Sequence, residues 1–281
     1  MHDIEILRPD LPRGHFRFVL FDFDGTLSLI REGWPQVMIP MMVDLLRETG
    51  TSEDDVTLRA QVEEFVMRLN GKQTIYQMMQ LGEEVKKRGG QALDPLAYKH
   101  RYHDLLMARI EGRIGALAAG QATPEDWTVP GSHALLKNLR SRGLTLYLAS
   151  GTDLPFVRRE AELLGLTEYF GPHIYGALDD YQNFSKKMVI ERLLEDNNLR
   201  GEELLGFGDG FVEIEEVRRA GGVAVAVASD EANRRGIHAW KRARLIRAGA
   251  DIVIGDYRQQ GPLVDYLLTD SPLAGKPSSH G

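Results

Sequence analysis

Short runs of apolar residues recur along most of the chain and predict buried β-strands. Each run ends at or near a Gly, Asp or Ser residue, as the strands of a parallel sheet do where the chain turns away. Between the later runs lie the stretches Gly131–Arg142 and Ser185–Asn197, which carry Leu, Ile or Val at helical spacing. This alternation predicts an α/β fold with a doubly wound, Rossmann-like parallel sheet. The predicted strands are Phe16–Phe23, Leu144–Ala149, His173–Ala177, Leu204–Phe207, Val223–Ala228 and Asp251–Ile254.

A different pattern interrupts the strands between about residues 29 and 128, where apolar residues follow a helical period and no run is typical of a strand. We therefore predict an all-helical cap domain, residues 29–128, inserted into an α/β core formed by residues 1–28 and 129–270. Residues 271–281 are expected to form a loose polar tail. The four helices of the cap are expected to start at Pro35, Ser52, Thr74 and Asp94-Pro95, and the last of them to end near Gly120.

Composition and charge narrow the class of protein. The 281 residues include 34 Lys and Arg and 41 Asp and Glu, a formal net charge of −7, and 43% of them are hydrophobic. This is enough apolar material for a full core, and a net acidic surface repels phosphate backbones, so we expect no nucleic-acid partner. The basic run Lys241-Arg242-Ala243-Arg244 is interpreted as a solvated helix face. The absence of cysteine excludes disulfides, thiolate catalysis and Cys-ligated metal sites.

No stretch of the sequence predicts a membrane partner. The first residues, MHDIEILRPDLPRGH, lack the apolar segment of a signal peptide. Val223–Ala228, one of the longest apolar runs, is far too short to span a bilayer. We therefore expect a cytoplasmic protein whose partner is a small molecule.

Two acidic residues follow the first predicted strand, in the segment DFDGT. Because side chains alternate along a strand, Asp22 and Asp24 point the same way, toward the crevice where open α/β sheets bind ligands. Gly25 lets the chain turn sharply, so that the following backbone N–H groups can face an anion. Two carboxylates this close favour a divalent cation and a division into nucleophile and proton donor. The alternative is an ordinary Asp-rich turn, which is common after strands.

Three later strand ends add further polar groups. The second strand is followed by Ser150-Gly151-Thr152, which offers hydroxyls and free amides. A lysine, Lys186 or Lys187, begins the helix after the third strand. Asp209 and Glu213 follow the fourth strand. The carboxyl ends of parallel strands meet at one edge of a sheet, so we expect all these groups in one crevice.

This order of motifs resembles the haloacid dehalogenase-like superfamily, in its phosphatase branch. The motifs are DFDGT, a strand-end Ser, a Lys and the segment GDGFVE, and they run from Phe18 to Glu213. The predicted helical insert is similar in position to the C1 caps of that superfamily. The resemblance implies a Mg²⁺-dependent phosphomonoester hydrolase with a mobile helical cap.

The resemblance also implies a role for each motif residue. Asp22 would be the nucleophile that forms an aspartyl-phosphate, and Asp24 would protonate the leaving alcohol and later activate water. Ser150, Gly151 and the lysine would bind the transferring phosphoryl group. Mg²⁺ would be held by Asp22, the carbonyl of Asp24, Asp209 and, through a water, Glu213.

Two details depart from the superfamily's pattern, and three residues are further candidates. The lysine is doubled, and Lys186 is favoured because apolar residues follow it at +3, +4 and +7. Glu213 stands where many relatives have Asp, and its longer side chain favours contact with the metal through a water. Lys72, between two cap helices, is a candidate for contact with a second anionic group of the substrate, and a solvated turn lysine is an equal alternative. Thr26 and Thr152 are candidates for substrate contact.

We expect a hydrolase of small phosphorylated metabolites, and three alternatives remain. A phosphomutase would return the phosphoryl group to a sugar, and a phosphonate hydrolase would need a Schiff base on a cap lysine such as Lys72. A catalytically silent module that binds a phosphorylated ligand is expected to lack a motif residue, and none is missing.

Overall fold

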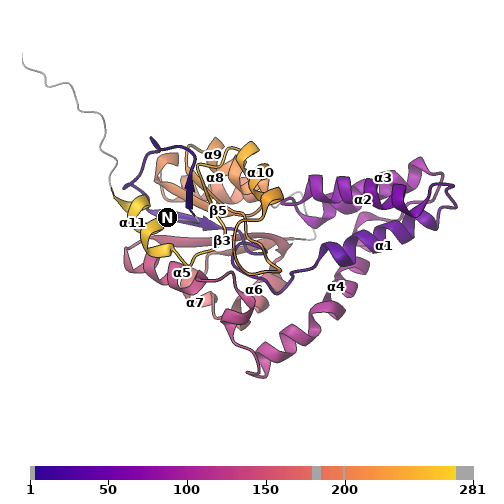
Figure 1. Ribbon diagram of the computed structural model, residues 1–281, viewed down its shortest axis with the longest axis horizontal. Coiled ribbons are helices and arrows are strands. Elements are labelled where there is room, and N and C mark those ends of the chain that lie inside the picture. Colours follow the sequence, from indigo (N-terminus) through magenta and orange to yellow (C-terminus); the bar gives the residue numbers. More distant parts are fainter. Residues whose placement is uncertain (1–3, 179–184, 199, 270–281) are drawn as a thin grey trace, which may run out of the picture.

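The computed structural model describes residues 4–178, 185–198 and 200–269, and its centre is a seven-stranded sheet (Figure 1). The strand order is β1-β7-β6-β5-β2-β3-β4, and neighbouring strands are parallel except for β1, which is antiparallel to β7. The α/β fold with a mostly parallel sheet is therefore confirmed. The strands are β1 (Ile4–Ile6), β2 (Phe18–Phe21), β3 (Thr145–Asp153), β4 (Ile174–Ala177), β5 (Leu204–Gly208), β6 (Val223–Val227) and β7 (Ile252–Ile254).

Successive side chains of a strand point to opposite faces of the sheet, and this divides the core into two layers. Val19 and Phe21 of β2 pack with α5, α6 and α11 on one face of the sheet, whereas Phe18 and Leu20 pack with α8, α9 and α10 on the other. Every residue of β2, β5 and β6 is buried, as continuous apolar runs predict for a sheet covered on both faces. The core helices are α5 (Ser132–Ser141), α6 (Leu154–Leu163), α7 (Thr167–Phe170), α8 (Lys186–Asp196), α9 (Phe211–Arg219), α10 (Ala239–Arg247) and α11 (Gln260–Leu268), with 3₁₀ turns at Pro124–Trp127 and Gly201–Glu203.

The structure differs from the predicted strands at several ends, and β2 (Phe18–Phe21) is shorter than the predicted Phe16–Phe23. β1 was not predicted, because three half-buried residues are too few to show a period. β3 continues to Asp153, beyond the predicted end at Ala149, through a shift of register between these two residues. That extension carries Ser150 and Thr152 along the sheet edge.

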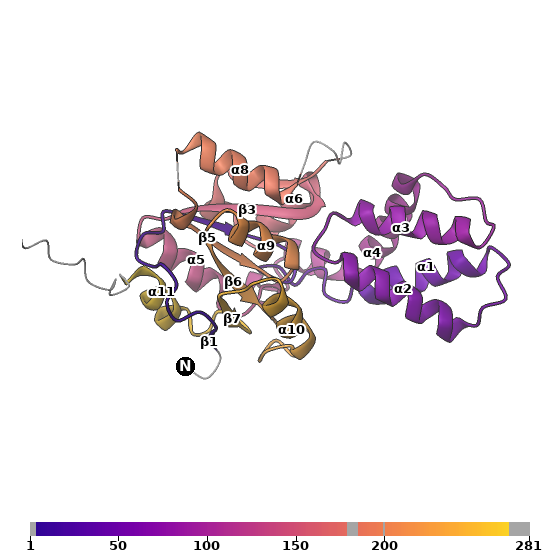
Figure 2. The same cartoon turned by 90° about the horizontal axis from the view of Figure 1, so that it is seen from above.

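The insert between β2 and β3 consists of helices in the described structure and extends to one side of the sheet (Figures 1 and 2). The helices are α1 (Pro35–Arg47), α2 (Asp55–Leu69), α3 (Thr74–Lys87) and α4 (Pro95–Ala118). The predicted start of the second helix at Ser52 is wrong. Asp54 caps that helix instead, because its Oδ1 accepts a hydrogen bond from Thr57 N (2.8 Å). None of the helices in the described residues is both long and apolar enough to cross a membrane. The predicted tail, 271–281, lies outside the described residues.

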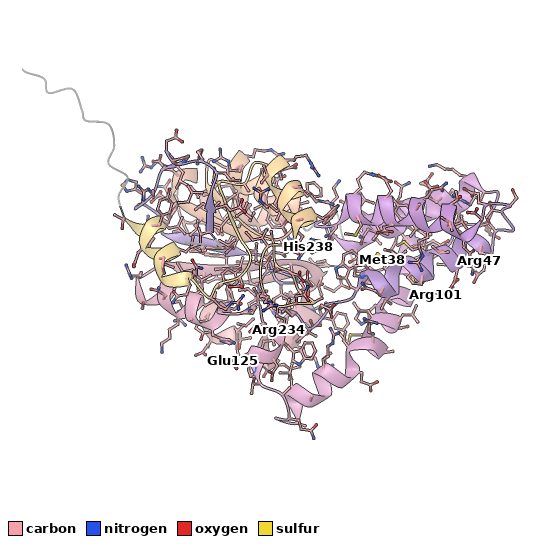
Figure 3. All side chains as sticks on the ribbon, in the orientation of Figure 1. Met38, Arg47, Arg101, Glu125, Arg234 and His238 are labelled. Atoms are coloured by element: carbon pink, nitrogen blue, oxygen red, sulfur yellow. The ribbon has the colours of Figure 1, made fainter. Side chains whose placement is uncertain are left out.

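Two arginine side chains hold the linkers between cap and core. Arg113 of α4 donates to the carbonyls of Ile30 (2.7 Å) and Glu32 (2.8 Å) in the first linker. Arg234, in the loop before α10, donates to the carbonyls of Glu125 (2.7 Å) and Asp126 (2.6 Å) in the second (Figure 3). The two linkers also meet each other through a β-bridge between residues 28 and 128. The cap is thus joined to the core by a paired, hydrogen-bonded neck.

A third arginine, Arg244 of α10, contacts the cap directly. Its guanidinium donates to the carbonyls of Met67, Arg68 (3.0 Å) and Asn70 (2.8 Å) at the C-terminal end of α2, and it lies over the ring of Phe211 (4.8 Å from the centroid). Carbonyls in the last turn of a helix lack their usual i+4 donors, and a cation complements the negative end of the helix dipole. The interpretation of this basic run as a solvated face is therefore wrong for Arg244.

Candidate active site

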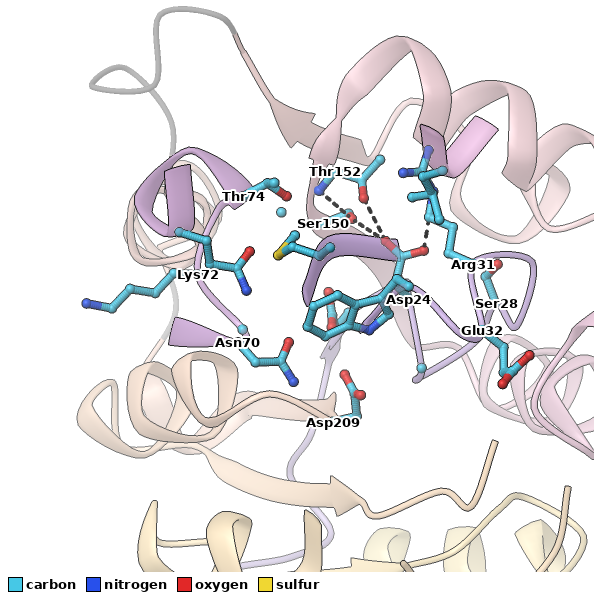
Figure 4. A pocket seen from close by; sticks show the side chains of 18 of the residues that line it. Asp24, Ser28, Arg31, Glu32, Asn70, Lys72, Thr74, Ser150, Thr152 and Asp209 are labelled. Atoms are coloured by element: carbon cyan, nitrogen blue, oxygen red, sulfur yellow. Dashed lines mark hydrogen bonds and ion pairs between the residues drawn. The ribbon is translucent and has the colours of Figure 1, made fainter. Parts of the chain in front are cut away.

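The carboxyl ends of β2, β3 and β5 meet at one cavity of about 100 Å³, between core and cap (Figure 4). The pairing of β2 with β5 places Asp22 N 3.0 Å from Phe207 O, so the chain segments that carry Asp22 and Asp209 leave the sheet side by side. The structure thus brings the predicted groups together, with the exceptions described below. The predicted site residues that line the cavity are Asp22, Asp24, Lys72, Ser150, Gly151, Thr152, Lys186 and Asp209.

Asp22 forms a buried ion pair with Lys186 at the floor of the cavity. Lys186 Nζ lies 2.8 Å from Asp22 Oδ1 and also donates to Glu213 Oε1. Burial outweighs the nearby ammonium and raises the pKa of Asp22 to about 7. Lys187 points elsewhere, because it is exposed and pairs with Glu191 (3.4 Å). Of the two lysines, Lys186 therefore faces the site.

Asp24 has different partners from Asp22. Its Oδ2 accepts hydrogen bonds from Thr152 Oγ1 (2.8 Å) and Ser150 Oγ (3.3 Å). Its Oδ1 is buried without a hydrogen-bond donor among the described residues, and Arg31 Nε lies 3.8 Å away (Figure 4). Burial raises the pKa of Asp24 to about 7, although the charge of Arg31 acts in the opposite direction.

Arg31 and Glu160 form a buried pair behind Asp24 that the sequence did not predict. Arg31 Nε lies 3.1 Å from both carboxylate oxygens of Glu160, and Nη2 lies 2.6 Å from Oε1. Arg31 is 8% exposed and Glu160 is 1% exposed, so neither is a surface charge. Arg31 lies in the first linker and Glu160 on α6, so the pair joins the cap's neck to the core beside Asp24.

Lys241 of α10 is a further site residue that the sequence did not predict. Its Nζ lies 2.8 Å from Asp209 Oδ2, 2.5 Å from Glu231 Oε1 and 3.2 Å from Ser229 Oγ. The interpretation of Lys241 as part of a solvated face is wrong, because α10 turns this side chain inward and leaves it 9% exposed. The carboxylate of Glu231 also lines the cavity.

Two candidates for substrate contact have positions that do not support that role. Thr26 is completely buried outside the cavity lining, where its Oγ1 accepts a hydrogen bond from Asp209 N (3.0 Å). Lys72 is exposed, and its ammonium points away from Asp24 (Figure 4) and lies 5.8 Å from the ring centroid of Tyr76. Thr26 therefore positions Asp209, and the Lys72 ammonium lies on the outer side of its loop.

The cap loop, residues 70–73, closes over the core at two glycines. A Cβ on Gly71 would lie 3.2 Å from Gly210 Cα, and a Cβ on Gly151 would lie 3.2 Å from the Lys72 carbonyl oxygen. Gly71 also has a φ of +95°, which other residues rarely adopt. The predicted phosphate ligand Gly151 thus forms the contact between the cap loop and the end of β3.

The donor set at this edge fits Mg²⁺. The charge of Asp22 contributes, after burial, to a raised pKa of Asp209, so the two carboxylates repel each other across the site. Among the described residues no three His, Asp or Glu side chains converge on one point. Mg²⁺ needs only one or two carboxylates, with waters and substrate oxygens completing its shell. Glu213 Oε2 is buried without a partner in the described structure, so it has an unused acceptor position that suits a water.

Several solved structures have the same fold as this chain, including its helical cap. A protein described as a predicted phosphoglycolate phosphatase from Haemophilus somnus superposes with a TM-score of 0.58 at 15% identity, over 89% of this chain and 98% of that one. A HAD family hydrolase from Deinococcus radiodurans, with bound phosphate and sodium, gives 0.54 at 18% identity, over 92% and 100%. A β-phosphoglucomutase from Clostridium difficile gives 0.57 at 14% identity, over 90% and 100%. At these identities the likeness shows the fold alone.

The sequence comparison places the chain in a family. No curated protein matches it. The family of haloacid dehalogenase-like hydrolases matches residues 16–221, which extend from just before β2 through the whole cap to just after α9. This range includes Asp22, Asp24, Ser150, Lys186 and Asp209. The chain therefore belongs to the haloacid dehalogenase-like hydrolase family.

Proposed function

We propose that this hydrolase cleaves phosphomonoesters of small metabolites, with Mg²⁺, through an aspartyl-phosphate on Asp22. The proposal depends on one observation: Asp22 and Asp24 line the same cavity, but one is paired with a cation and the other with neutral hydroxyls. The ammonium of Lys186 holds Asp22, whereas the hydroxyls of Ser150 and Thr152 hold Asp24. Two carboxyl groups in different surroundings suit the roles of nucleophile and acid–base group. Similarity in fold to a predicted phosphoglycolate phosphatase and to a phosphate-bound relative supports the proposal.

In the first step, a carboxylate oxygen of Asp22 attacks phosphorus and the bond from phosphorus to the alcohol oxygen breaks. Asp24 gives its proton to that oxygen, so the alcohol leaves neutral. The pKa of about 7 that burial gives Asp24 makes the carboxylic acid available near neutral pH. Lys186 and the Ser150 hydroxyl, which also line the cavity, neutralise oxygens of the transferring group.

In the second step, a water attacks phosphorus from the side that the alcohol has left. Asp24, now ionised, takes a proton from that water, and the bond between phosphorus and Asp22 breaks to release phosphate. The same carboxyl group serves both steps because the leaving oxygen and the incoming water occupy the same position.

Membership of the family implies a typical dependence on Mg²⁺, and the residues present fit it. Asp22, Asp209 and the carbonyl of Asp24 would hold the ion, with Glu213 contacting one of its waters. When bound, the ion supplies charge neutralisation of the phosphoryl oxygens and of the two repelling carboxylates.

We propose that residues 29–128 open to admit substrate and close to exclude water. In the closed arrangement described here, the cap loop contacts Gly151 and Gly210 at the mouth of the cavity. Closure protects the aspartyl-phosphate during its formation, and opening releases the products.

Phosphate release from a panel of small phosphomonoesters, with Mg²⁺ and with EDTA, tests the proposal. We expect Mg²⁺-dependent release that disappears in Asp22→Asn, and retention of activity in the surface variant Asp44→Asn. Substantial release by Asp22→Asn would overturn the nucleophile assignment.

The alternative functions predict other outcomes. A phosphomutase would move a labelled phosphoryl group to a sugar, the reaction named for one neighbour of similar fold. The outward position of Lys72 does not support a phosphonate hydrolase, and borohydride trapping of a Schiff base would contradict that conclusion. A silent binding module would hold a phosphorylated ligand without turnover.

A further inference from the structure

Apart from Arg31, Glu32 and Lys72, the side chains that the cap contributes to the described cavity lining are uncharged. Met38 lies on α1, which begins beside Trp34, and the two bring a thioether and an indole to the cavity. Leu106 and the hydroxyl-bearing Tyr102 come from α4, and Asn70 and Gln77 bring side-chain amides. The amide of Gln77 is fixed, because its Nε2 donates to Val66 O (3.0 Å).

The cations that line the cavity are paired with carboxylates or point out of it. In the described lining there are three. Lys186 is bound to Asp22 and Glu213, and it lies at the phosphoryl end. Arg31 is bound to Glu160 and faces Asp24.

The third cation is Lys72, whose ammonium lies on the far side of the cap loop, next to Tyr76 (Figure 4). Lys72 also lines a second groove, together with Phe211 and Glu215, and this groove shares Gly151 and Lys186 with the reacting cavity. No positive charge in the described lining is therefore left over for a second anionic group of a substrate.

The charges around the cavity therefore disfavour a leaving group that is itself negatively charged. A carboxylate or second phosphate at the cap end would lose its hydration without gaining a counter-ion, and the carboxylates of Asp24, Asp209 and Glu231 would repel it. An uncharged alcohol avoids both costs. Its apolar face packs against Trp34, Met38 and Leu106, and its remaining hydroxyls reach the amides and the Tyr102 hydroxyl.

We propose that the substrate's leaving group is an uncharged alcohol with an apolar ring or chain face, and that bisphosphates and phosphorylated carboxylic acids are poor substrates. The proposal rests on the proposed function, because the alcohol part of the substrate contacts the cap only if the phosphoryl group binds beside Asp22. It replaces the prediction that Lys72 receives a second anionic group.

Matched pairs of phosphomonoesters test the inference. The pairs are phenyl phosphate with 4-carboxyphenyl phosphate, glycerol 3-phosphate with 3-phosphoglycerate, and glucose 1-phosphate with glucose 1,6-bisphosphate. We expect kcat/KM to be about tenfold or more higher for the less charged member of each pair, since one unpaired buried charge costs at least the 1.4 kcal/mol of a tenfold change. A preference for the anionic members would overturn the proposal.

Two cap variants sharpen the test. Thr74→Lys places a new cation at the cavity from the first turn of α3, and we expect it to raise kcat/KM for the anionic members selectively. Lys72→Met removes a cation from the neighbouring loop, and we expect the ratio within each pair to stay unchanged. If Lys72→Met lowers the activity toward the anionic members alone, Lys72 contacts the substrate and the proposal is wrong.

Binding separates a failure of this inference from a failure of the proposed function. Equilibrium binding of the same pairs is measured with Asp22→Asn, which holds substrate without turning it over. Tighter binding of the neutral members, with no phosphate release by the unmodified protein, would contradict the phosphatase alone and support the inference. Tighter binding of the anionic members would contradict the inference even if the protein releases phosphate.

Discussion

Lys241 and Asp209 form a buried ion pair, with Nζ 2.8 Å from Oδ2, at the edge of the candidate metal site. Glu231 shares the same ammonium at 2.5 Å. The pair joins α10 to the end of β5. The last third of the chain therefore completes a site whose reacting carboxylates, Asp22 and Asp24, follow β2. Lys241 thus keeps two acidic side chains compatible with burial when no metal is bound.

Lys241→Met is expected to destabilise the metal-free protein. Removal of one partner of a buried ion pair leaves uncompensated charge and typically costs about 3–5 kcal/mol. Mg²⁺ should restore more stability to this variant than to the unmodified protein, because the ion then neutralises Asp209. Thermal unfolding with EDTA and with Mg²⁺ measures both effects. The control is Lys187→Met, an exposed lysine. Equal losses of stability in the two variants would contradict the prediction.

Arg244→Gln is expected to loosen the cap while the core stays folded. The variant loses charge-assisted hydrogen bonds to the end of α2, which we expect to contribute about 1–2 kcal/mol at this half-buried site. Amide hydrogen exchange should accelerate in residues 67–72 and remain unchanged in β5 and β6. The matched control on the same helix is Arg242→Gln, which breaks a contact with Glu5. Unchanged exchange in residues 67–72 would show that Arg244 does not hold the cap.

Glu160→Gln is expected to change the pH dependence of turnover. Burial is the main cause of the raised pKa of Asp24, and the charge of Glu160 adds to it. Without that charge Arg31 interacts more strongly with Asp24, so the pKa of Asp24 falls and less of its acid form remains at neutral pH. We expect kcat at pH 7.5 to fall by about 3–10-fold and the alkaline limb of the kcat profile to move to lower pH. A lower kcat with an unmoved limb would indicate a purely structural role for Glu160.

Mg²⁺ should stabilise the protein more at pH 8 than at pH 6. In the metal-free protein burial raises the pKa values of Asp22 and Asp24 to about 7, well above those of an unfolded chain. A raised folded-state pKa stabilises the fold fully at low pH, and that contribution is lost as the pH rises from about 4 through 7. Above pH 7 both carboxylates are ionised, so Asp22 binds Mg²⁺ without releasing a proton. The increase in melting temperature on adding Mg²⁺, measured at both pH values, checks this, and a larger increase at pH 6 would contradict it.

The sequence predicted the parts of the site that follow from the sheet itself. Asp22, Ser150 and Asp209 follow apolar strands, and parallel strands bring their carboxyl ends to one edge, so their meeting could be inferred without coordinates. Lys186 could be separated from Lys187 by helical spacing, because only one of two adjacent residues can face the sheet. The cap was recognisable because its helical period replaces the strand pattern.

The remaining site residues depend on tertiary placement that no local pattern records. Lys241 and Arg244 lie in a basic run that looks like a solvated face, yet the approach of α10 to β5 and to the cap turns both inward. Arg31 and Glu160 are 129 positions apart, and each alone resembles a surface charge. The hydropathy pattern shows which strands are buried, and it contains no information on which distant charges meet. The cytoplasmic location and the domain boundaries remain predictions.

The place of the cap within the chain has a consequence for biosynthesis. β2 is an inner strand, and its Phe18 pairs with Thr145 on one side and Leu204 on the other. At about 5–20 residues per second, a ribosome takes on the order of 10 s to add the cap before either partner strand exists. During that time β2 is an unpaired apolar segment on the nascent chain, whereas α1–α4 already have one another as packing partners. We therefore expect the cap to fold first and the catalytic centre, which needs strands from both ends of the sequence, to assemble last.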